Sequence, residues 1–297
     1  MKATVILPVY NQPERLRLTM LGLQQTDFAE PFEIVVVDDG SEPETARAIE
    51  DIQLPEHARC TLLYQENAGR AIARNRGIAH SRGEILIFCD ADRVPSPQFV
   101  SEHVAAHGTS NQRVVIGNVQ EMYISKLDKI RGYADLAPHM QRSKTPRYIK
   151  LMNDIYDSAG HTDSQVAWMT FYSGNASVHR AVLAQQQFEE GFVTWGVEHF
   201  ELGLRLLQAG LEFTFAERAV NYHIAHARES SFYKDAYAKT LSHFASLHGE
   251  TIASHFYAFM NGELSLQEME HRIGSPQAEW LCRIEEPIVY KSISALR

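Results

Sequence analysis

Two aspartates, Asp90 and Asp92, directly follow the apolar run Ile85–Cys89 and are separated by a single alanine. The apolar run predicts a buried strand, and residues two apart in a strand point to the same face. Two carboxylates beside a buried strand are costly unless a partner neutralises them, and hard oxygen ligands suit Mg²⁺ or Mn²⁺. The pair therefore predicts a divalent-cation site, although a solvated surface turn would give the same pattern.

Similar polar groups follow two other apolar runs. Ala3–Val9 and Phe32–Val37 predict buried strands, and the residues at their ends include Pro8, Tyr10 and Asp39. Cys60–Tyr64 predicts one more strand, and the segments between the strands have helical periodicity over 14–25, 43–52 and 71–80. Strands that alternate with helices favour an α/β fold with a mostly parallel, Rossmann-like sheet flanked by helices. Ligands bind at the carboxyl ends of such strands, so these polar groups should share one site.

Amide and arginine side chains lie between the third and fourth predicted strands. Arg70 and Arg74 are four residues apart and share one helical face. A guanidinium group suits phosphate oxygens. We expect Asn67 and Arg74 to contribute to a nucleotide site, with Arg74 either holding a diphosphate or ordering the aspartates. A solvated helix face with a glycine turn is the alternative.

Further along, the segments YSGNAS, WGVEHF and NYHIAH combine groups that bind sugars or metals with candidate general bases. Together with VILPVYNQPERL, VVVDDGS and ENAGRAIARNRGIAHSRGEILIFCDADRV, they resemble the family 2 glycosyltransferases of the GT-A fold. The carboxyl half is similar to galactosyl- and N-acetylhexosaminyl-transferases and to bacterial chondroitin-type polymerases. The resemblance extends from the start of the chain to about residue 226.

The resemblance implies roles for the nucleotide-sugar site. Asp39 would contact the base, with Pro8 and Tyr10 lining its pocket. Asp92 would bind the cation directly, while Asp90, next to Ala91, would contact the ribose, the cation or a water bound to it. Counting 28 residues from Trp195 places the metal histidine of the family at His223, with His226 as the runner-up.

The resemblance also implies an acceptor site, and here the sequence departs from the pattern. Trp195 and Asn175 would lie at the donor sugar. Family members commonly have an aspartate base at the position of His199. The base would then be Glu198, if its pKa is raised, or His199, which needs no large shift. Alternatively, the segment WGVEH is an ordinary helix start, and Asn175 belongs to an ordinary turn.

We therefore expect a metal-dependent glycosyltransferase that uses Mn²⁺ or Mg²⁺. It would move a hexose or N-acetylhexosamine from a UDP-sugar to a hydroxyl of an unknown saccharide, glycoconjugate or small-molecule acceptor, with inversion. A sugar-phosphate nucleotidyltransferase would share the sheet and the carboxylates, but LPVYNQPER lacks the expected glycine-rich loop. A catalytically weak binding protein for nucleotide sugars or carbohydrates is the other alternative, favoured only by His199.

Composition limits the class of protein. The net charge of −9 over 297 residues argues against nucleic-acid binding. No apolar run approaches the ~20 residues that span a bilayer, and no signal peptide precedes the first strand, so we expect a cytoplasmic protein. The cysteines have no metal-binding spacing and predict buried thiols in a reducing compartment; they are Cys60, Cys89 and Cys282.

The expected organisation is a catalytic domain over residues 1–226 and a helical C-terminal extension over 227–297. The catalytic domain would divide into a nucleotide-binding half, 1–117, and an acceptor half, 118–226. Residues 121–171 match the family least and should form a mixed helical segment on the acceptor side. The extension is rich in aromatic residues with helical spacing, which indicates core packing or, alternatively, acceptor recognition or the interface of a homodimer.

Overall fold

The computed structural model describes residues 1–193, 196–226, 232–274, 276–284 and 286–290, with the backbone alone for 232–239. Its sheet has eight strands in the order β3-β2-β1-β4-β7-β6-β8-β5. Their bounds in this order are Ala58–Gln65, Phe32–Asp39, Ala3–Val9, Ile85–Cys89, Asn175–His179, Arg113–Met122, Glu212–Ile224 and Arg93–Pro95.

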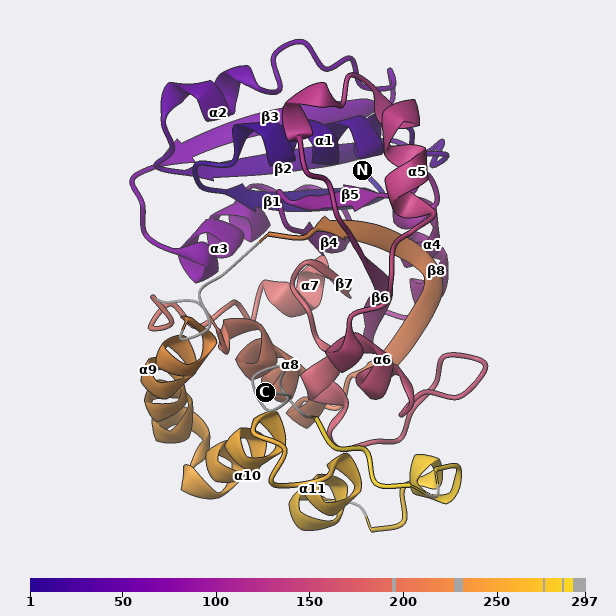
Figure 1. Cartoon of the computed structure of the whole chain (residues 1–297), viewed down its shortest axis with the longest axis vertical. Coiled ribbons are helices and arrows are strands. Elements are labelled where there is room, and N and C mark those ends of the chain that lie inside the picture. Colours follow the sequence, from indigo (N-terminus) through magenta and orange to yellow (C-terminus); the bar gives the residue numbers. More distant parts are fainter. Residues whose placement is uncertain (194–195, 227–231, 275, 285, 291–297) are drawn as a thin grey trace.

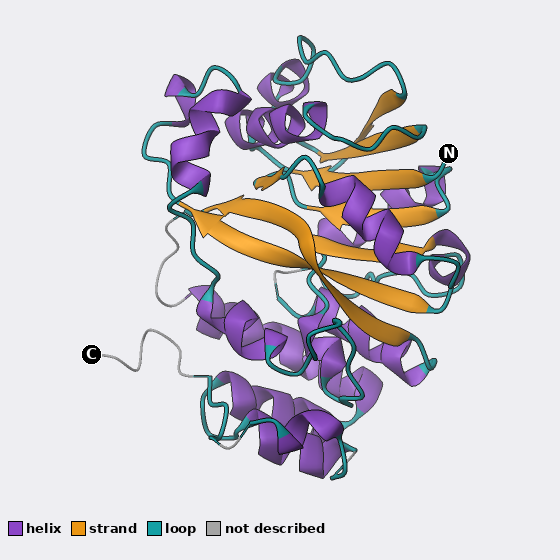
Figure 2. Ribbon diagram, turned by 90° about the vertical axis from the view of Figure 1, so that its right-hand side faces the viewer, coloured by secondary structure: helices purple, strands orange, loops and turns teal. Residues whose placement is uncertain are grey.

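The first four strands of this order are parallel, as the alternation of strands and helices predicts. Strand β7 runs antiparallel to both of its neighbours, β4 and β6, and β6 and β8 are parallel. The short β5 pairs antiparallel with β8. The predicted fold class, a mostly parallel sheet flanked by helices, is confirmed (Figures 1 and 2).

Helices cover both faces of the sheet (Figure 2). The predicted helices of the first half are present as α1, α2 and α3, which span Pro13–Gln24, Pro43–Arg47 and Arg70–His80. The expectation of a helix to Ile52 is wrong for α2. After Arg47 the backbone continues in tighter turns, with Glu50 N–H bonded to the carbonyl of Arg47. α4 (Phe99–His107) packs against β6 and β8.

The middle of the chain is irregular and contains several short helices, as expected for residues 121–171. These are η1 (Leu127–Lys129), η2 (Tyr133–Leu136), α5 (Ala137–Met140), α6 (Arg147–Asn153) and η3 (Ala167–Thr170). β7 then leads to α7 (Arg180–Leu183), and α8 (Glu198–Gln208) precedes β8.

The predicted helical extension is also present, as α9 (Phe232–His248), α10 (Glu250–Met260), α11 (Leu266–Ile273) and η4 (Glu279–Cys282). In Figure 1, α9 lies to the left of α8, and α10 and α11 lie below it. The rings of Phe244 and Phe256 lie 6.0 and 5.4 Å from that of Trp168 in η3, and Phe256 also contacts Phe200 of α8. The extension therefore shares one aromatic core with η3 and α8, which is the packing role that the helical spacing predicts.

The prediction of three buried thiols is wrong for two of them. Cys89 is buried in β4, but Cys60 and Cys282 are exposed. Cys60 lies on β3, which ends the sheet order and has no strand on its outer side to cover it. Within the described residues, no helix has the length and apolar character needed to cross a membrane.

Candidate nucleotide-sugar site

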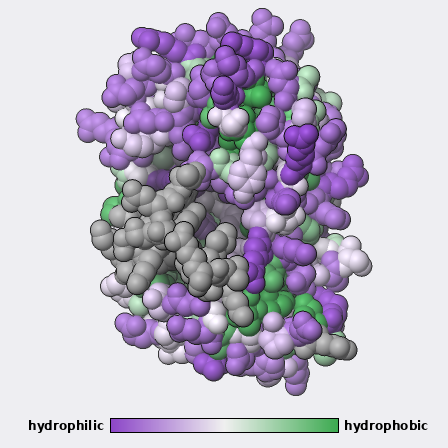
Figure 3. Space-filling view, in the orientation of Figure 1, coloured by the Kyte–Doolittle hydropathy of each residue, from purple (hydrophilic) through white to green (hydrophobic). Residues whose placement is uncertain are grey.

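A cavity of about 520 Å³ opens at the carboxyl ends of β1, β2 and β4. Figure 3 shows a hollow near the middle of this face of the molecule. Most of the residues predicted for the site line the cavity: Pro8, Tyr10, Asp39, Asn67, Arg74, Asp90, Ala91, Asp92, Glu198, His199 and His223. Trp195 lies outside the described residues. The structure thus brings the strand ends of the first 92 residues together with Glu198, His199 and His223, which are far away in the sequence.

Asp39, the last residue of β2, is held by the loop that follows β3. Its carboxylate accepts hydrogen bonds from the Gln65 side chain at 2.7 Å and from the backbone N–H groups of Ala68 and Gly69 at 2.9 Å. The Asn67 amide donates to the backbone carbonyl of Asp39 at 2.9 Å. The same amide lies 3.3 Å from the Asp39 carboxylate, so Asn67 acts on the site by fixing Asp39.

Arg74 joins the two halves of the cavity. It projects from α3 with 1% of its side chain exposed, and its Nη2 donates to Asp90 Oδ1 at 2.9 Å. Its Nη1 donates to Glu198 Oε1 at 3.3 Å. Of the two roles expected for Arg74, the structure therefore favours the ordering of carboxylates.

Asp90 is surrounded by positive charge. Its second carboxylate oxygen lies 3.4 Å from Arg93 Nε. Burial would raise the pKa of Asp90, but the charges of Arg74 and Arg93 outweigh burial and lower it. The carboxylate is thus paired with two guanidinium groups, and its expected role at the cation stays a prediction.

Asp92, His223 and His226 form the cluster that is suited to a cation. One ligand atom from each lies within 4.8 Å of the others. His223 Nε2 is 3.5 Å and His226 Nδ1 is 3.9 Å from Asp92 Oδ2. The pairing of β5 with β8 places Arg93 opposite His223, which brings the aspartate segment to the histidines. Both histidines weighed from the sequence are therefore at the cluster.

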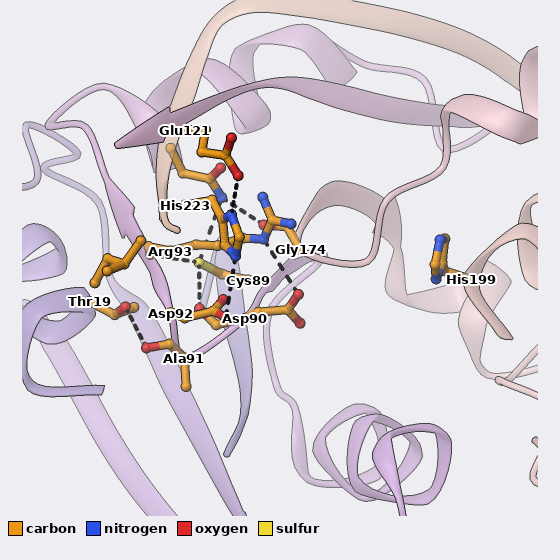
Figure 4. A network of polar contacts seen from close by, with 12 residues as sticks. Thr19, Cys89, Asp90, Ala91, Asp92, Arg93, Glu121, Gly174, His199 and His223 are labelled. Atoms are coloured by element: carbon orange, nitrogen blue, oxygen red, sulfur yellow. Dashed lines mark hydrogen bonds and ion pairs between the residues drawn. The ribbon is translucent and has the colours of Figure 1, made fainter. Parts of the chain in front are cut away.

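A second carboxylate contacts the ring nitrogen of His223 that faces away from Asp92. Glu121 Oε1 of β6 lies 3.4 Å from His223 Nδ1, so the imidazole lies between Glu121 and Asp92 (Figure 4). Burial would raise the pKa of Asp92, but the hydrogen bond from His223 and its charge lower it. An ionised Asp92 is the form in which a carboxylate coordinates a metal.

Glu198 and His199 are the first two residues of α8. Figure 4 shows His199 apart from Asp92 and His223. Glu198 is 2% exposed and accepts from the backbone N–H of Gly196 at 3.1 Å as well as from Arg74. Burial would raise its pKa, but the interactions with His199 and the charge of Arg74 lower it. Glu198 therefore lacks the raised pKa that a role as general base would require. His199 Nδ1 lies 3.7 Å from Glu198 Oε1 and the imidazole lines the cavity.

Comparison of the chain with known protein families shows where it belongs. The profile described as "Glycosyl transferase family 2" matches residues 4–183. The chain belongs to glycosyltransferase family 2. Its sheet and helices form the GT-A fold, as the resemblance implied.

Relatives of this glycosyltransferase differ in what they do. The uncharacterized glycosyltransferase YfnE of Bacillus subtilis is 32% identical over 76% of the chain, and the validoxylamine A glucosyltransferase of Streptomyces hygroscopicus subsp. jinggangensis is 27% identical over 87%. The chain spans 65% and 64% of these relatives, less than two thirds of each. The chondroitin synthase of Escherichia coli is 23% identical over 74% of the chain and 34% of its own length, which confirms the predicted similarity to such polymerases.

Solved structures share the fold. S. aureus TarS 1–349 in complex with UDP-GlcNAc has a TM-score of 0.61 at 18% identity, covering 93% of this chain and 74% of TarS. The mannosyltransferase PcManGT from Pyrobaculum calidifontis, in complex with GDP-Man and Mn²⁺, has a TM-score of 0.58 at 18% identity, covering 83% and 64%. Identities this low establish the fold of the glycosyltransferase and no more.

Asn175 is one predicted site residue that the structure places elsewhere. It is fully buried in β7 and does not line the cavity. Its side chain bonds the His103 ring at 2.8 Å and donates to the backbone carbonyls of Asn118 and Ala219 at 3.1 Å. The glycine before it, Gly174, lines the cavity instead. A Cβ there would collide with Arg93, so a glycine lets the chain approach the aspartates closely.

The sequence alone missed several residues of the glycosyltransferase site. Arg93 directly follows the aspartate pair, and its position was a signal that could have indicated it. Glu121 could not be found in this way, because it reaches the site through the pairing of β6 with β8, where it lies opposite His223. The same holds for cavity residues drawn from the middle and the end of the chain: Tyr148, Tyr172, Met260 and Tyr290.

Proposed function

We propose that this glycosyltransferase transfers a hexose or N-acetylhexosamine from a UDP-sugar to an acceptor hydroxyl, with inversion and with Mn²⁺ or Mg²⁺ as cofactor. One observation carries the proposal: a single cavity is lined by the held carboxylate of Asp39, the Asp92–His223 pair and His199. An acidic acceptor such as Asp39 suits the imide N–H of uracil. The UDP-GlcNAc complex of TarS and the GDP-Man and Mn²⁺ complex of PcManGT support a nucleotide sugar and a metal for this fold.

The residues present fit a divalent cation. Asp92 would supply a carboxylate oxygen, while His223 and His226 would supply imidazole nitrogens. A mixed oxygen and nitrogen set suits Mn²⁺ at least as well as Mg²⁺. When bound, the ion supplies Lewis-acid stabilisation of the charge on the departing diphosphate. Glu121 orients His223, as outer carboxylates orient metal-binding imidazoles in general.

The guanidinium groups add fixed positive charge beside the same position. Arg70 and Arg93 line the cavity together with Arg74. Arg74 uses both of its Nη groups on Asp90 and Glu198. Arg93, in contrast, contacts Asp90 through Nε, and its buried Nη1 has no hydrogen-bond partner among the described residues. We therefore assign Arg70 and Arg93 to phosphate oxygens. Such preorganised charge stabilises a leaving group without reorganisation at the moment of reaction.

His199 is the base that we propose for the acceptor hydroxyl. Imidazole exchanges protons more readily near neutral pH than other side chains do. Glu198 is unsuited because Arg74 and Gly196 hold its ionised carboxylate, but at 3.7 Å from His199 it can orient the ring and stabilise the charge gained with the proton. Proton removal would assist the hydroxyl as it attacks the anomeric carbon, while UDP leaves on the opposite face.

The test is a panel of UDP- and GDP-sugars incubated with the protein and Mn²⁺, with and without EDTA, while release of the nucleoside diphosphate is followed. We expect slow hydrolysis of one UDP-sugar that EDTA abolishes and added Mn²⁺ restores. Hydrolysis that is indifferent to EDTA would remove the metal from the proposal. If no donor is hydrolysed and calorimetry detects no UDP binding, the nucleotide site itself is wrong.

A further inference from the structure

One side of the cavity has no role in the transfer described so far. It is an aromatic wall formed by Tyr148, Tyr172, Phe200 and Tyr290, and Met260 lines the same cavity. We propose that the aromatic wall is the acceptor subsite and that it selects an uncharged sugar, whose apolar ring face packs on the tyrosines. This proposal rests on the proposed function, because an acceptor is needed only if the cavity takes a nucleotide sugar.

The aromatic wall is a preformed surface. Tyr148 lies at its centre, with ring centroids 5.7 Å from Tyr172, 5.2 Å from Tyr290 and 6.2 Å from Phe200. The first two contacts are edge-to-face, a favoured arrangement that fixes one ring against another. The Tyr148 hydroxyl also donates to the Met169 carbonyl at 3.2 Å. Binding to side chains that are already ordered costs little conformational entropy.

The aromatic wall leads directly to the proposed base. The His199 ring lies 4.1 Å from Phe200 and 6.0 Å from Tyr172, centroid to centroid. On its other side, Nδ1 of the same imidazole faces Glu198. A sugar that packs on the tyrosines would therefore place its hydroxyl groups at the boundary where His199 lies.

The charge distribution around the cavity favours a neutral acceptor. The charged groups of the lining lie at the strand ends, on α3 as Arg70 and Arg74, around His223 and at Glu198, and none of the wall residues carries a formal charge. The basic residues nearby in the sequence, Arg142, Lys144, Arg147 and Lys150, do not line the cavity. Among the described residues the wall itself offers no cationic group, so an anionic acceptor packed on it would lose hydration without gaining a partner from the wall. The C–H groups of a pyranose ring, in contrast, suit the negative face of an aromatic ring.

The C-terminal extension supplies part of this subsite. Met260 ends α10 and Tyr290 follows η4, and both lie beyond residues 4–183, which match the family. Tyr290 also packs on Phe259 of α10, with centroids 6.3 Å apart. Acceptor choice would thus depend on a region that the family profile does not cover.

The experiment measures transfer with Mn²⁺ and the donor that the nucleotide-sugar panel identifies. The acceptors are methyl β-glucoside and methyl β-N-acetylglucosaminide as neutral sugars, and methyl β-glucuronide and glucose 6-phosphate as anionic ones. We expect a kcat/KM at least tenfold higher for a neutral acceptor. Tyr290→Ala and Tyr148→Leu should raise the acceptor KM about tenfold, a typical effect of losing an aromatic partner, with the UDP dissociation constant within twofold of the wild type.

Two controls separate recognition from folding. Tyr257→Ala changes a tyrosine of α10 that is 43% exposed and does not line the cavity, so the acceptor KM should stay within twofold. Tyr148→Phe keeps the ring and should keep the KM even if Tyr148→Leu unfolds. Anionic acceptors used as well as neutral ones, or an unchanged KM in Tyr290→Ala, would overturn the inference alone. Absence of both UDP binding and UDP release would instead refute the proposed function, and the inference with it.

Discussion

The charged side of the cavity and the aromatic wall are built in different ways. On the charged side, Asp39 ends β2 and Asp92 follows β4, and these two strands flank β1 in the sheet. Each aspartate is positioned by its own strand and the loop that follows. The aromatic wall is drawn from α6, α8, the segment before β7 and residue 290, which lie far apart in the sequence.

This difference separates chemistry that is local in the sequence from recognition that is not. Hydrogen bonding between strands fixes their register, and the register fixes the position of a motif at the end of a strand. A wall of side chains from several helices depends on packing across the core, and such packing can change with the sequence of any contributing element. We therefore expect substitutions on the charged side to abolish turnover and substitutions in the aromatic wall to change acceptor affinity.

The largest effect is expected from Asp92→Asn. An amide is a weaker ligand than a carboxylate, and it leaves His223 without its ionised partner at 3.5 Å. Turnover with Mn²⁺ should fall by ~10³-fold, within the range that loss of electrostatic stabilisation costs, and Mn²⁺ affinity measured by calorimetry should fall with it. Asp51→Asn, an exposed position outside the cavity, is the matched control. Retained Mn²⁺ affinity would remove Asp92 from the metal site.

His199→Ala tests the boundary between the two sides. Loss of a general base costs roughly 10²-fold or more, so transfer should fall by that factor, whereas UDP affinity should stay within twofold. His80→Ala, an exposed histidine of α3 outside the cavity, should behave as the wild type. A transfer rate that stays within threefold of the wild type would show that the base lies elsewhere.

Arg74→Met should affect stability as well as activity, because Arg74 connects the two sides. It leaves Glu198 buried without its guanidinium partner and removes one of the two partners of Asp90. Breaking a buried ion pair by removing one partner costs about 3–5 kcal/mol. Chemical denaturation should show a loss of this order, and a double variant with Glu198→Gln should recover part of it. A loss below ~1 kcal/mol, the scale of a surface pair, would contradict the bridging role.

The smallest expected effect is on the pH dependence of the free energy of unfolding, and it comes from a residue outside both the charged side and the aromatic wall. His103 is fully buried against Ser177 and Asn175, and burial lowers its pKa to about 4. Since the unfolded chain titrates near the ordinary pKa of about 6.5, it binds more protons than the folded protein between these values. The free energy of unfolding should therefore be highest above pH ~6.5 and fall as the pH drops toward 4.

His103→Gln provides the measurement for this expectation. The full contribution of His103 is roughly 3 kcal/mol, from a pKa of about 6.5 in the unfolded chain and about 4 in the folded protein. Denaturation of the wild type and of His103→Gln at pH 7.5 and 5 should give a smaller pH dependence for the variant. His107 has its pKa lowered by burial to about 3 and should retain its own share of the effect. Equal pH dependence in both proteins would assign the acid sensitivity to other groups.

The sequence by itself determined the parallel half of the sheet and the residues at its strand ends. Apolar runs followed by polar groups have a direct physical meaning, because the carboxyl ends of parallel strands meet at one edge. For this reason the pattern itself indicates Asp39 and Asp92, whereas His223 follows only from the spacing that the family resemblance implies. The helix periodicity of the extension likewise predicted its packing role.

Only the tertiary structure decided how these groups are paired. Sequence spacing does not tell which carboxylate faces an arginine and which faces an imidazole, so Asp90 was expected at the ribose or the cation, and a base role for Glu198 depended on a raised pKa. Arg74, 16 and 124 residues away in the chain, contacts both carboxylates, and its charge helps to lower the pKa of each. Glu121 and Tyr290 reached the cavity through strand pairing and aromatic packing, which are long-range contacts that no local pattern encodes.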